Sequence, residues 1–278
     1  MKLNHFQAAD RFYERVKDHL EQHTAQHCML LRACYALLHN PQPRARPPYL
    51  ATVEAEDILA VAVWISPRYL ILSQVRDFAA LDLIAQDLST HQEPLPGVSS
   101  LPDIATAFAQ KWQALTQQSY KLSLKLWANQ LVQVQSIPQA SGYLQLAEEG
   151  DRSLLINWLK AFDIEALGQI ENNAEASVDR ALAQKTLYLW HDGVPVSMAG
   201  GRKSLPNGGW ISPVYTPPEY RRKGYASSCV AALSQRLLDQ GCDYCMLFTD
   251  QTNSTSNHVY QAIGYQPVCD WYDYSFYQ

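Results

Sequence analysis

The spacing of apolar residues predicts alternating helices and strands in the first half of the chain. Between residues 8 and 38 they recur every three or four positions, which is typical of a helix, and the proline-rich tract at 40–48 ends it. A turn-rich stretch follows at 92–101, and two β-rich runs meet at Ala128 and Asn129, where we expect a hairpin turn. In chain order, the predicted elements after the first helix are strands 49–53, 58–65 and 69–75, helices 79–88 and 103–116, and strands 120–127 and 130–137.

The second half shows the same kind of pattern with clearer turn signals. Asp192-Gly193 between two apolar runs is a typical hairpin turn, and Gly241 is placed to end a helix. The small polar stretch 138–142 separates the halves, so we predict domains over residues 1–138 and 139–278. The predicted elements are strand 143–146, helices 151–162 and 174–184, strands 187–191, 194–200 and 210–216, helix 226–240, strand 244–249, helix 257–263 and strand 266–277.

The two halves resemble each other in the order of their elements. Helices, a strand pair, a further strand and another helix follow one another in each half, and the tripeptide Ile-Ser-Pro recurs at 65–67 and 211–213. Three residues are too few to establish an internal duplication, which therefore stays open.

Composition indicates an ordinary globular protein without a general affinity for anions. The 278 residues include 22 Lys and Arg against 27 Asp and Glu, a formal net charge of −5. We therefore expect neither nucleic acid nor an anionic membrane as a partner. The N-terminal residues lack the apolar core of a signal peptide and no long apolar run follows, so we expect a cytoplasmic protein. We further expect a monomer or a homodimer.

Cysteines and histidines suggest no metal or disulfide chemistry. The six cysteines lie mostly in apolar runs, so we expect reduced, buried thiols, and the Cys242-x-x-Cys245 pair lacks the second pair of a structural zinc site. His19, His23 and His27 fall at helical spacing, where three imidazoles could bind a metal. No carboxylate or thiol supports that interpretation, so we take them as a polar surface stripe and predict no metal site.

The sharpest chemical signal lies between a predicted strand and an amphipathic helix. A chain that passes through a glycine into a helix can point several backbone amides at one place, and the positive end of the helix dipole adds to them. Neighbouring basic residues supply local positive charge, so the segment predicts a site for an anion such as pyrophosphate. The whole segment runs from the strand residues Val214, Tyr215 and Thr216 through Arg221, Arg222, Lys223 and Gly224, where the anion would bind, to Tyr225, Ala226 and Ser227.

These residues carry a resemblance to a known family. Arg221-x-x-Gly224-x-Ala226 resembles the Arg/Gln-x-x-Gly-x-Gly/Ala signature of GCN5-related N-acetyltransferases (GNATs), and a second family element runs from Asn253 through Asn257 and Tyr260 to Gly264-Tyr265. The resemblance covers about residues 143–270. It implies an α/β fold with a mixed, mostly antiparallel twisted sheet flanked by helices, in what we expect to be two tandem domains.

The resemblance also implies how the cofactor, acetyl-CoA, would be held. Backbone groups of Val214, Tyr215 and Thr216 would bind the pantetheine arm and the acetyl carbonyl, because the family's strands separate there. The amides from Arg222 to Ser227 would hold the pyrophosphate. Asn253 and Asn257 match positions that bind the pantetheine or fix the loop beside it.

Tyr260 matches the family's general acid, which protonates the departing thiolate. The alternative is an aromatic residue that only packs against Tyr265. The general base is open: the strand that carries a glutamate in some relatives reads Met246-Leu247-Phe248 here, which leaves Asp250, His258 or a water relay. Asp250 could instead cap the next turn and His258 could be a solvated helix residue.

The resulting hypothesis is an N-acetyltransferase in which an amine attacks acetyl-CoA directly. The acceptor would be a small amine or a protein amino group, which the sequence does not identify. The alternatives are a coenzyme A-binding sensor without catalysis, or an acyltransferase that uses a longer acyl or an aminoacyl donor. The N-terminal half has no Arg-x-x-Gly-x-Ala segment, and Gly97, the glycine in the turn-rich stretch at 92–101, lacks basic neighbours. We interpret that half as a degenerate copy of the fold, or as a domain that shapes the substrate cleft, packs against the catalytic half or mediates association.

Overall fold

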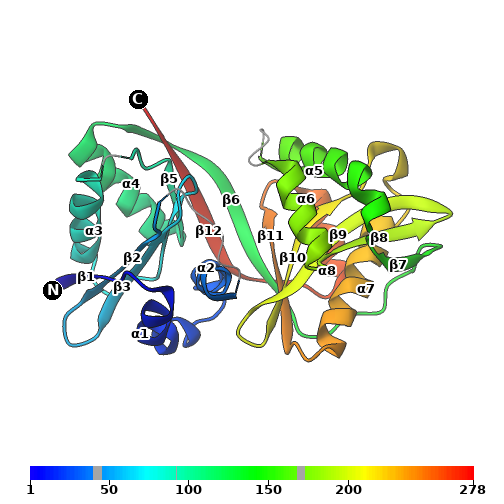
Figure 1. The fold of residues 1–278 in the computed structure, drawn as a ribbon, viewed down its shortest axis with the longest axis horizontal. Coiled ribbons are helices and arrows are strands. Elements are labelled where there is room, and N and C mark those ends of the chain that lie inside the picture. Colours follow the sequence, from blue (N-terminus) through cyan, green and yellow to red (C-terminus); the bar gives the residue numbers. More distant parts are fainter. Residues whose placement is uncertain (40–45, 92, 168–172) are drawn as a thin grey trace.

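The computed structural model describes residues 1–39, 46–91, 93–167 and 173–278. Its strands form one twelve-stranded sheet in the order β1-β2-β3-β4-β5-β12-β6-β11-β10-β9-β8-β7. Figure 1 shows two lobes, one around β1–β5 and the other around β7–β11, with the long strands β6 and β12 between them. Part of the predicted proline-rich tract and of the turn-rich stretch at 92–101 lies outside the described residues.

Most predicted elements are found within a few residues of their predicted bounds. The N-terminal half contains β1 (Lys2–His5), α1 (Ala9–Glu21), α2 (Cys28–His39), β2 (Tyr49–Glu54), β3 (Ile58–Trp64), β4 (Leu70–Leu72), α3 (Ala79–Ser89), β5 (Gly97–Ser100), α4 (Pro102–Thr116) and β6 (Ser119–Leu131). The C-terminal half contains β7 (Tyr143–Leu146), the short 3-10 helix η1 (Glu149–Asp151), α5 (Arg152–Leu167), α6 (Ala174–Ala183), β8 (Leu187–Asp192), β9 (Val194–Leu205), β10 (Gly208–Tyr215), η2 (Pro218–Tyr220), α7 (Tyr225–Asp239), β11 (Tyr244–Asp250), α8 (Ser254–Ile263) and β12 (Gln266–Tyr277).

The two halves repeat one strand topology. In each half, four strands pair antiparallel in sequence order, and the fourth then pairs parallel with the fifth, as β4 with β5 and β10 with β11. The sixth strand of each half crosses over: β12 pairs with β5, and β6 pairs with β11. The predicted fold class, a mixed and mostly antiparallel sheet flanked by helices, is therefore confirmed. The recurring Ile-Ser-Pro does not mark this repeat, because Ile65 follows β3 whereas Ile211 lies inside β10.

The hairpin predicted at Ala128 and Asn129 is wrong. β6 is a single strand of 13 residues that continues straight through both positions. Ala128 pairs with Phe248 of β11 on one side and Cys269 of β12 on the other, and the Asn129 side chain donates to Thr249 at 3.0 Å. The small Ala128 and the polar Asn129 instead fit a strand enclosed by two neighbours.

Two further local predictions are wrong. The helical stretch 8–38 is broken into α1 and α2 by a turn, in which the His27 amide bonds the His23 carbonyl at 3.1 Å. The turn-rich stretch 92–101 contains the strand β5, whose residues are all buried between β4 and β12. Four residues in a tight space give too short a pattern for sequence periodicity to detect.

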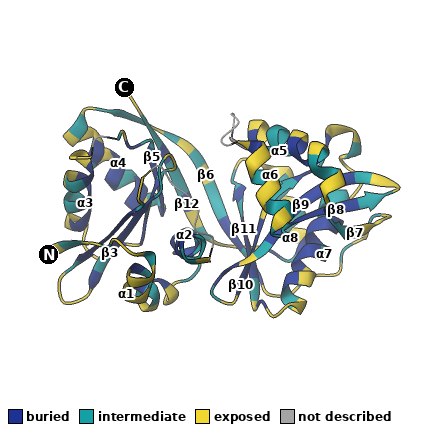
Figure 2. Cartoon of the chain, in the orientation of Figure 1, coloured by how far each residue is buried: buried dark blue, intermediate teal, exposed yellow. Residues whose placement is uncertain are grey.

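Helices cover both faces of the sheet in each lobe. In the C-terminal half, α7 and α8 pack on the sheet face that presents Ile211 and Leu247. The helices α5 and α6 pack on the opposite face, which presents Leu189 and Met198. In the N-terminal half, α3 and α4 share one core, while α1 and α2 share another that includes Trp210 of β10. The helix α2 thus joins the two lobes, and Figure 2 shows the strands buried beneath these layers. Among the described residues, every helix is too short or too polar to cross a lipid bilayer.

Candidate active site

The candidate site begins where two parallel strands separate. β10 and β11 pair only from Gly208–Trp210 to Tyr244–Met246, although β10 continues to Tyr215 and β11 to Asp250. Beyond Trp210 the ladder of β10 is therefore formed with β9 alone. The edge of Val214 and Tyr215 that faces β11 has backbone groups available for a ligand. Ser197 of β9 fixes this end of the strand, since its hydroxyl donates to the Tyr215 carbonyl at 3.2 Å.

The chain then turns into α7 through the 221–227 segment. Gly224 is the N-cap with a φ of 81°, and Arg222 also has a positive φ of 63°. A side chain at Gly224 would be strained by this conformation rather than by lack of space, because the nearest atom to a Cβ placed there would be Ala140 Cβ at 3.6 Å. Among the described residues, no acceptor receives a hydrogen bond from the amides of Arg222 to Ser227, whereas the next amide, at Ser228, bonds the Gly224 carbonyl at 3.0 Å. The helix thus begins with an unsatisfied group of donors.

The three basic side chains of this segment differ in what they contact. Arg221 is held in place: its Nε donates to the Thr216 carbonyl and its Nη2 to both carboxylate oxygens of Glu165 on α5, all at 2.8 Å. Arg222 and Lys223 form no ion pair with any described residue, so their charge is free to act on an anion. Sequence reasoning missed Glu165, which lies 56 positions away and carries no local signal.

Tyr225 at the first turn of α7 is fixed from the other side. Its hydroxyl donates to Asp192 at 2.6 Å, and Ser141 donates to the same carboxylate oxygen at 2.7 Å. These hydrogen bonds, that of Tyr225 first, lower the pKa of Asp192. The predicted hairpin around Gly193, whose φ is 73°, therefore also anchors the start of α7.

The two asparagines of α8 have different roles. Asn253 is the N-cap, and its side chain accepts from the Ser256 amide at 3.0 Å. Asn257 is buried and donates to the carbonyls of Asp250 and Gln251 at 3.1 and 3.3 Å. Its Oδ1 is buried without any hydrogen-bond partner among the described residues. An orphaned acceptor of this kind is costly unless a ligand donates to it.

Tyr260 lies on α8 beside the core of the C-terminal half. Its ring meets the Tyr265 ring edge-on, with the centroids 5.9 Å apart, and its hydroxyl bonds no described residue. Burial, with a smaller contribution from nearby Cys229, raises the pKa of Tyr260 far above its ordinary value. Tyr260 therefore keeps its proton at neutral pH. Burial also raises the pKa of Cys229 to about 12, so this thiol is not a nucleophile.

The two residues proposed as a base lie in ordinary structural settings. Asp250 Oδ1 accepts from the amide and the hydroxyl of Thr252 at 2.7 and 2.8 Å, which is the turn-capping role. His258 is exposed on α8. Neither position contradicts catalysis: Thr252 holds the Asp250 carboxylate, and His258 has no side-chain hydrogen bond to a described residue.

The histidines near the N-terminus are not a surface stripe. His27 is 1% exposed, its Nδ1 lies 2.9 Å from the Leu20 carbonyl, and it stacks on His19. Burial lowers the pKa of His27 to about 4. Because α1 ends at Glu21, His23 and His27 lie beyond it, and the predicted helical spacing is wrong there. The described residues contain no group of His, Cys, Asp or Glu that could hold a metal ion, and their six cysteines are free thiols.

The position equivalent to the 221–227 segment in the N-terminal half is not near Gly97. In the repeated topology, α3 corresponds to α7, so the equivalent residues precede Ala79. There Asp77 accepts from the Ala79 amide through its side chain at 2.9 Å and from the Ala80 amide through its carbonyl at 3.0 Å. The amides at the start of α3 are thus satisfied internally.

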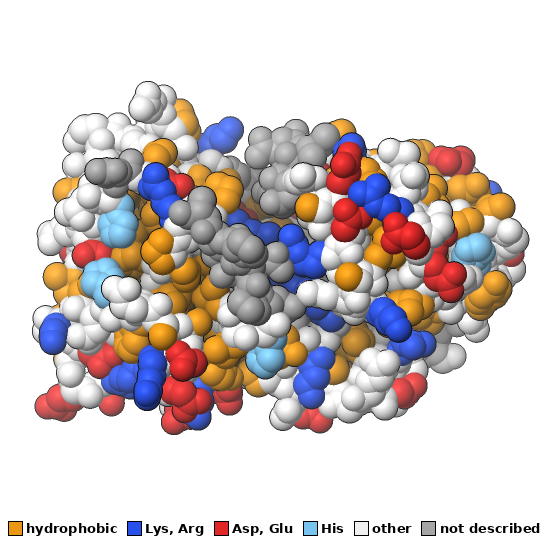
Figure 3. Space-filling view, viewed as in Figure 1, with side chains coloured by type: hydrophobic (Ala, Val, Ile, Leu, Met, Phe, Trp, Pro, Cys, Tyr) orange, Lys and Arg blue, Asp and Glu red, His pale blue; other side chains and the backbone are white. Residues whose placement is uncertain are grey.

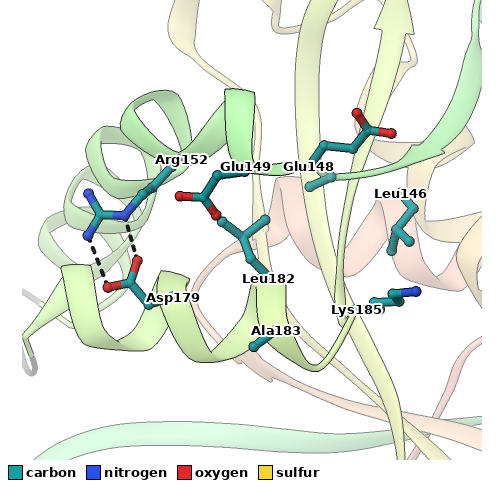
Figure 4. Close-up of a pocket in the computed structure, with 9 residues that line it drawn as sticks. Leu146, Glu148, Glu149, Arg152, Asp179, Leu182, Ala183 and Lys185 are labelled. Atoms are coloured by element: carbon teal, nitrogen blue, oxygen red, sulfur yellow. Dashed lines mark hydrogen bonds and ion pairs between the residues drawn. The ribbon is translucent and has the colours of Figure 1, made fainter.

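A separate hollow of about 580 Å³ lies away from these residues. It is bounded by Leu146, Glu148 and Glu149 on one side and by α6 on the other, where Arg152 holds Asp179 through two hydrogen bonds (Figure 4). It includes no residue of the 221–227 segment. We assign it no part in cofactor binding.

Comparison with known proteins identifies a family for the C-terminal half. Residues 145–265 match the acetyltransferase (GNAT) family, so the C-terminal half contains a GNAT domain. No curated protein matches the chain at a significant level.

Solved structures extend the likeness to the whole chain. A GNAT-family acetyltransferase from Colwellia psychrerythraea aligns over 100% of both chains at 12% identity and a TM-score of 0.60. A Drosophila protein aligns over 99% of this chain and 98% of its own at 12% identity and a TM-score of 0.69. A tandem GNAT protein from the clavulanic acid biosynthesis pathway aligns over 99% and 98% at 11% identity and a TM-score of 0.55. The N-terminal half is therefore GNAT-like in fold, and the family membership of the C-terminal half supports acyl transfer as the general activity.

Proposed function

We propose that the protein transfers an acetyl group from acetyl-CoA to an amine, with direct attack of the amine on the bound thioester. The observation that carries this proposal is the set of unbonded amides from Arg222 to Ser227 at the start of α7, with Arg222 and Lys223 beside them. A diphosphate is the ligand that satisfies several converging amides and two free cations together.

The remaining groups fit the rest of the cofactor. The free edge of Val214 and Tyr215 would bind the pantetheine arm as an added strand binds a sheet. The orphaned Oδ1 of Asn257 would accept from an amide of that arm. Asn253 shapes the α8 start rather than touching the ligand, because its side chain is already bonded to Ser256.

Tyr260 would act as the general acid. As the tetrahedral intermediate collapses, the carbon–sulfur bond breaks and the sulfur needs a proton, which the un-ionised phenol can supply by hydrogen bonding and transfer. The buried thiol of Cys229 makes an acyl-cysteine route unfavourable, which supports direct attack. The base is proposed to be Asp250, His258 or a water chain.

Calorimetry with coenzyme A and thiol release from acetyl-CoA with a panel of amines test the proposal. We expect micromolar binding and turnover with at least one amine. Binding without turnover on any amine would favour the sensor, and turnover only with longer acyl thioesters would favour a different donor. A failure to bind coenzyme A would refute the proposed function altogether.

A further inference from the structure

Four arginines from both halves gather at the junction of the lobes. This arginine cluster consists of Arg32 on α2, Arg68 between β3 and β4, Arg180 on α6 and Arg202 on β9. Burial, then repulsion from Arg202 and Arg68, lowers the pKa of Arg32 to about 9, and burial, with repulsion from Arg180 and Arg68, lowers the pKa of Arg202. Figure 3, viewed as in Figure 1, shows Lys and Arg side chains along the middle of the molecule, between the lobes. Like charges are thus held close together in a protein of net charge −5.

No carboxylate of the described residues neutralises the cluster. None of the four arginines is in an ion pair within the described ranges, although seven other Lys and Arg residues, Lys111 and Arg221 among them, are paired with carboxylates. Arg202 donates only to the neutral Gln184 side chain at 3.1 Å, and Arg32 only to the sulfur of Met29 at 3.4 Å. Holding cations together without an anion is unfavourable, and the cost is greatest for a buried one.

Unsatisfied donors lie beside the charges. The guanidinium of Arg32 lies 3.9 Å from the centre of the Trp210 ring. The Nε of Arg32, the indole Nε1 of Trp210 and the hydroxyl of Ser204 are each buried with no hydrogen-bond partner in the described part of the chain. Ser204 is two residues from Arg202 on β9, at an irregularity of the ladder, and Trp210 pairs with Arg202 across that ladder. An anionic ligand would accept hydrogen bonds from these buried donors and neutralise the unpaired arginines beside them.

The cluster lies on the other face of the sheet from the proposed diphosphate site. Trp210 packs against α2, whereas Ile211 packs against α7, so the arginines lie on the sheet face opposite the helix that would bind the diphosphate. Along β10, Trp210 precedes Val214 by four residues, roughly 13 Å at the usual rise of a strand. A molecule that reached from the thioester to the cluster would carry its amine and its acid group at opposite ends.

We infer that the arginine cluster binds the carboxylate or phosphate group of an acceptor whose amine and acid group are several bonds apart. The assignment to an acceptor rests on the proposed function, whereas the anion site itself does not depend on it. The two halves would then divide the work, because Arg32 and Arg68 come from the N-terminal half and Arg180 and Arg202 from the GNAT half.

Direct titration tests the anion site. Inorganic phosphate and succinate are titrated into the full chain, with coenzyme A present to occupy the 221–227 segment and again without it. We expect Arg202→Gln and Arg68→Gln each to weaken binding of at least one probe about 10-fold or more. The matched control is Lys203→Gln, which removes the same charge from the next, exposed residue of β9 and should leave affinity unchanged. Because Arg68 is exposed, its variant should fold normally even if Arg32→Gln does not.

Kinetics test the assignment to an acceptor. 6-Aminohexanoate is compared with hexylamine, and an aminoalkyl phosphate of similar length distinguishes phosphate from carboxylate. We expect a lower KM for an acidic amine, and Arg202→Gln should abolish that preference. Equal probe affinity in Arg202→Gln, Arg68→Gln and Lys203→Gln, or no binding of either probe, would overturn the anion site. Probe binding without any preference for an acidic amine would overturn the acceptor assignment. Failure of coenzyme A to bind would refute only the proposed function, since the titration without coenzyme A still decides the anion site.

Discussion

The helices α3 and α7 occupy equivalent places in the two halves, yet they begin differently. At α3, Asp77 accepts from the first amides of the helix. At α7 the equivalent position, two residues before the helix, is Lys223, and the amides of the 221–227 segment have no acceptor among the described residues. In one half, the carboxylate of Asp77 thus bonds the start of the helix, whereas in the other half no described carboxylate takes that position. A shared fold therefore does not give the two helix starts the same capacity to hold a ligand.

A second difference lies one element later. Tyr260 is the seventh residue of α8, which begins at Ser254, and the seventh residue of α4, which begins at Pro102, is Phe108. Phe108 is fully buried and stacks on Trp112. The N-terminal half therefore has a satisfied helix start at α3 and a phenylalanine at the position of Tyr260. Each difference can be transferred by a single substitution.

Tyr260→Phe gives the C-terminal half the residue type of its counterpart and should have the largest effect. We expect kcat to fall by about 100- to 1000-fold with coenzyme A affinity unchanged, because only the proton donor is lost. Steady-state kinetics and calorimetry separate the two quantities. Tyr265→Phe is the control: its hydroxyl bonds Ser234 at 2.8 Å, so its loss should cost about 1 kcal/mol of stability and leave kcat intact. Equal kcat in Tyr260→Phe and wild type would exclude the acid role.

Lys223→Asp places a carboxylate where α3 has Asp77. It should satisfy the α7 amides internally and repel the diphosphate, and we expect coenzyme A affinity to fall about 100-fold, or some 3 kcal/mol. Lys223→Gln removes the cation without adding an acceptor and should cost only about threefold. Isothermal titration of coenzyme A measures both. Equal losses in the two variants would mean that charge alone, and not the open amides, matters.

Asp77→Ala removes the side-chain acceptor of the Ala79 amide, while the carbonyl of residue 77 still accepts from the Ala80 amide. We expect a loss of about 1 kcal/mol in the free energy of unfolding, as for other lost helix caps, measured by urea denaturation. We expect no second coenzyme A site, because Arg76, the adjacent cation, is paired with Asp57 at 3.2 Å. A binding stoichiometry of two in calorimetry would show that open amides suffice without free cations.

The pH dependence should show no contribution from Tyr260 in the neutral range. Because burial raises the pKa of Tyr260, the phenol stays protonated in the folded protein above pH 10, whereas it ionises near pH 10 when unfolded. Its contribution to stability is therefore complete below about pH 10 and is lost as pH rises beyond that. We expect kcat not to decline between about pH 7 and 10 through loss of this proton. A basic limb near neutral pH that disappears in Tyr260→Phe would contradict this.

The smallest effect is expected at the ion pair that holds the 221–227 segment. Arg221 and Glu165 are each nearly half exposed, so Glu165→Gln should cost less than about 1 kcal/mol in stability. Coenzyme A affinity should fall only a few-fold, about two- to threefold, through a looser segment. Calorimetry at low and high salt would check this, since screening should remove the difference.

Local sequence determined most of the elements and the strongest candidate residues. The apolar spacing of α7, Gly224 at its start and Gly241 after its end are local features, because helix periodicity and capping act over a few residues. Because these signals act over only a few residues, they fail at Asn129 and at His27, which are polar residues enclosed by segments far away in the chain. No window of the sequence contains those neighbours.

The sequence by itself thus determined the type of each long element and which residues make the 221–227 segment a candidate anion site. Only the tertiary structure decided that β6 and β12 would each join the sheet of the other half and that Glu165 would hold Arg221. It also decided that four arginines from both halves would gather at the junction of the lobes, with Arg32 over the Trp210 ring. The physical reason is the separation along the chain over which each kind of interaction acts. Capping, turns and periodicity depend on neighbours along the chain, whereas strand partners and the electrostatic environment of a buried charge depend on residues brought together by packing.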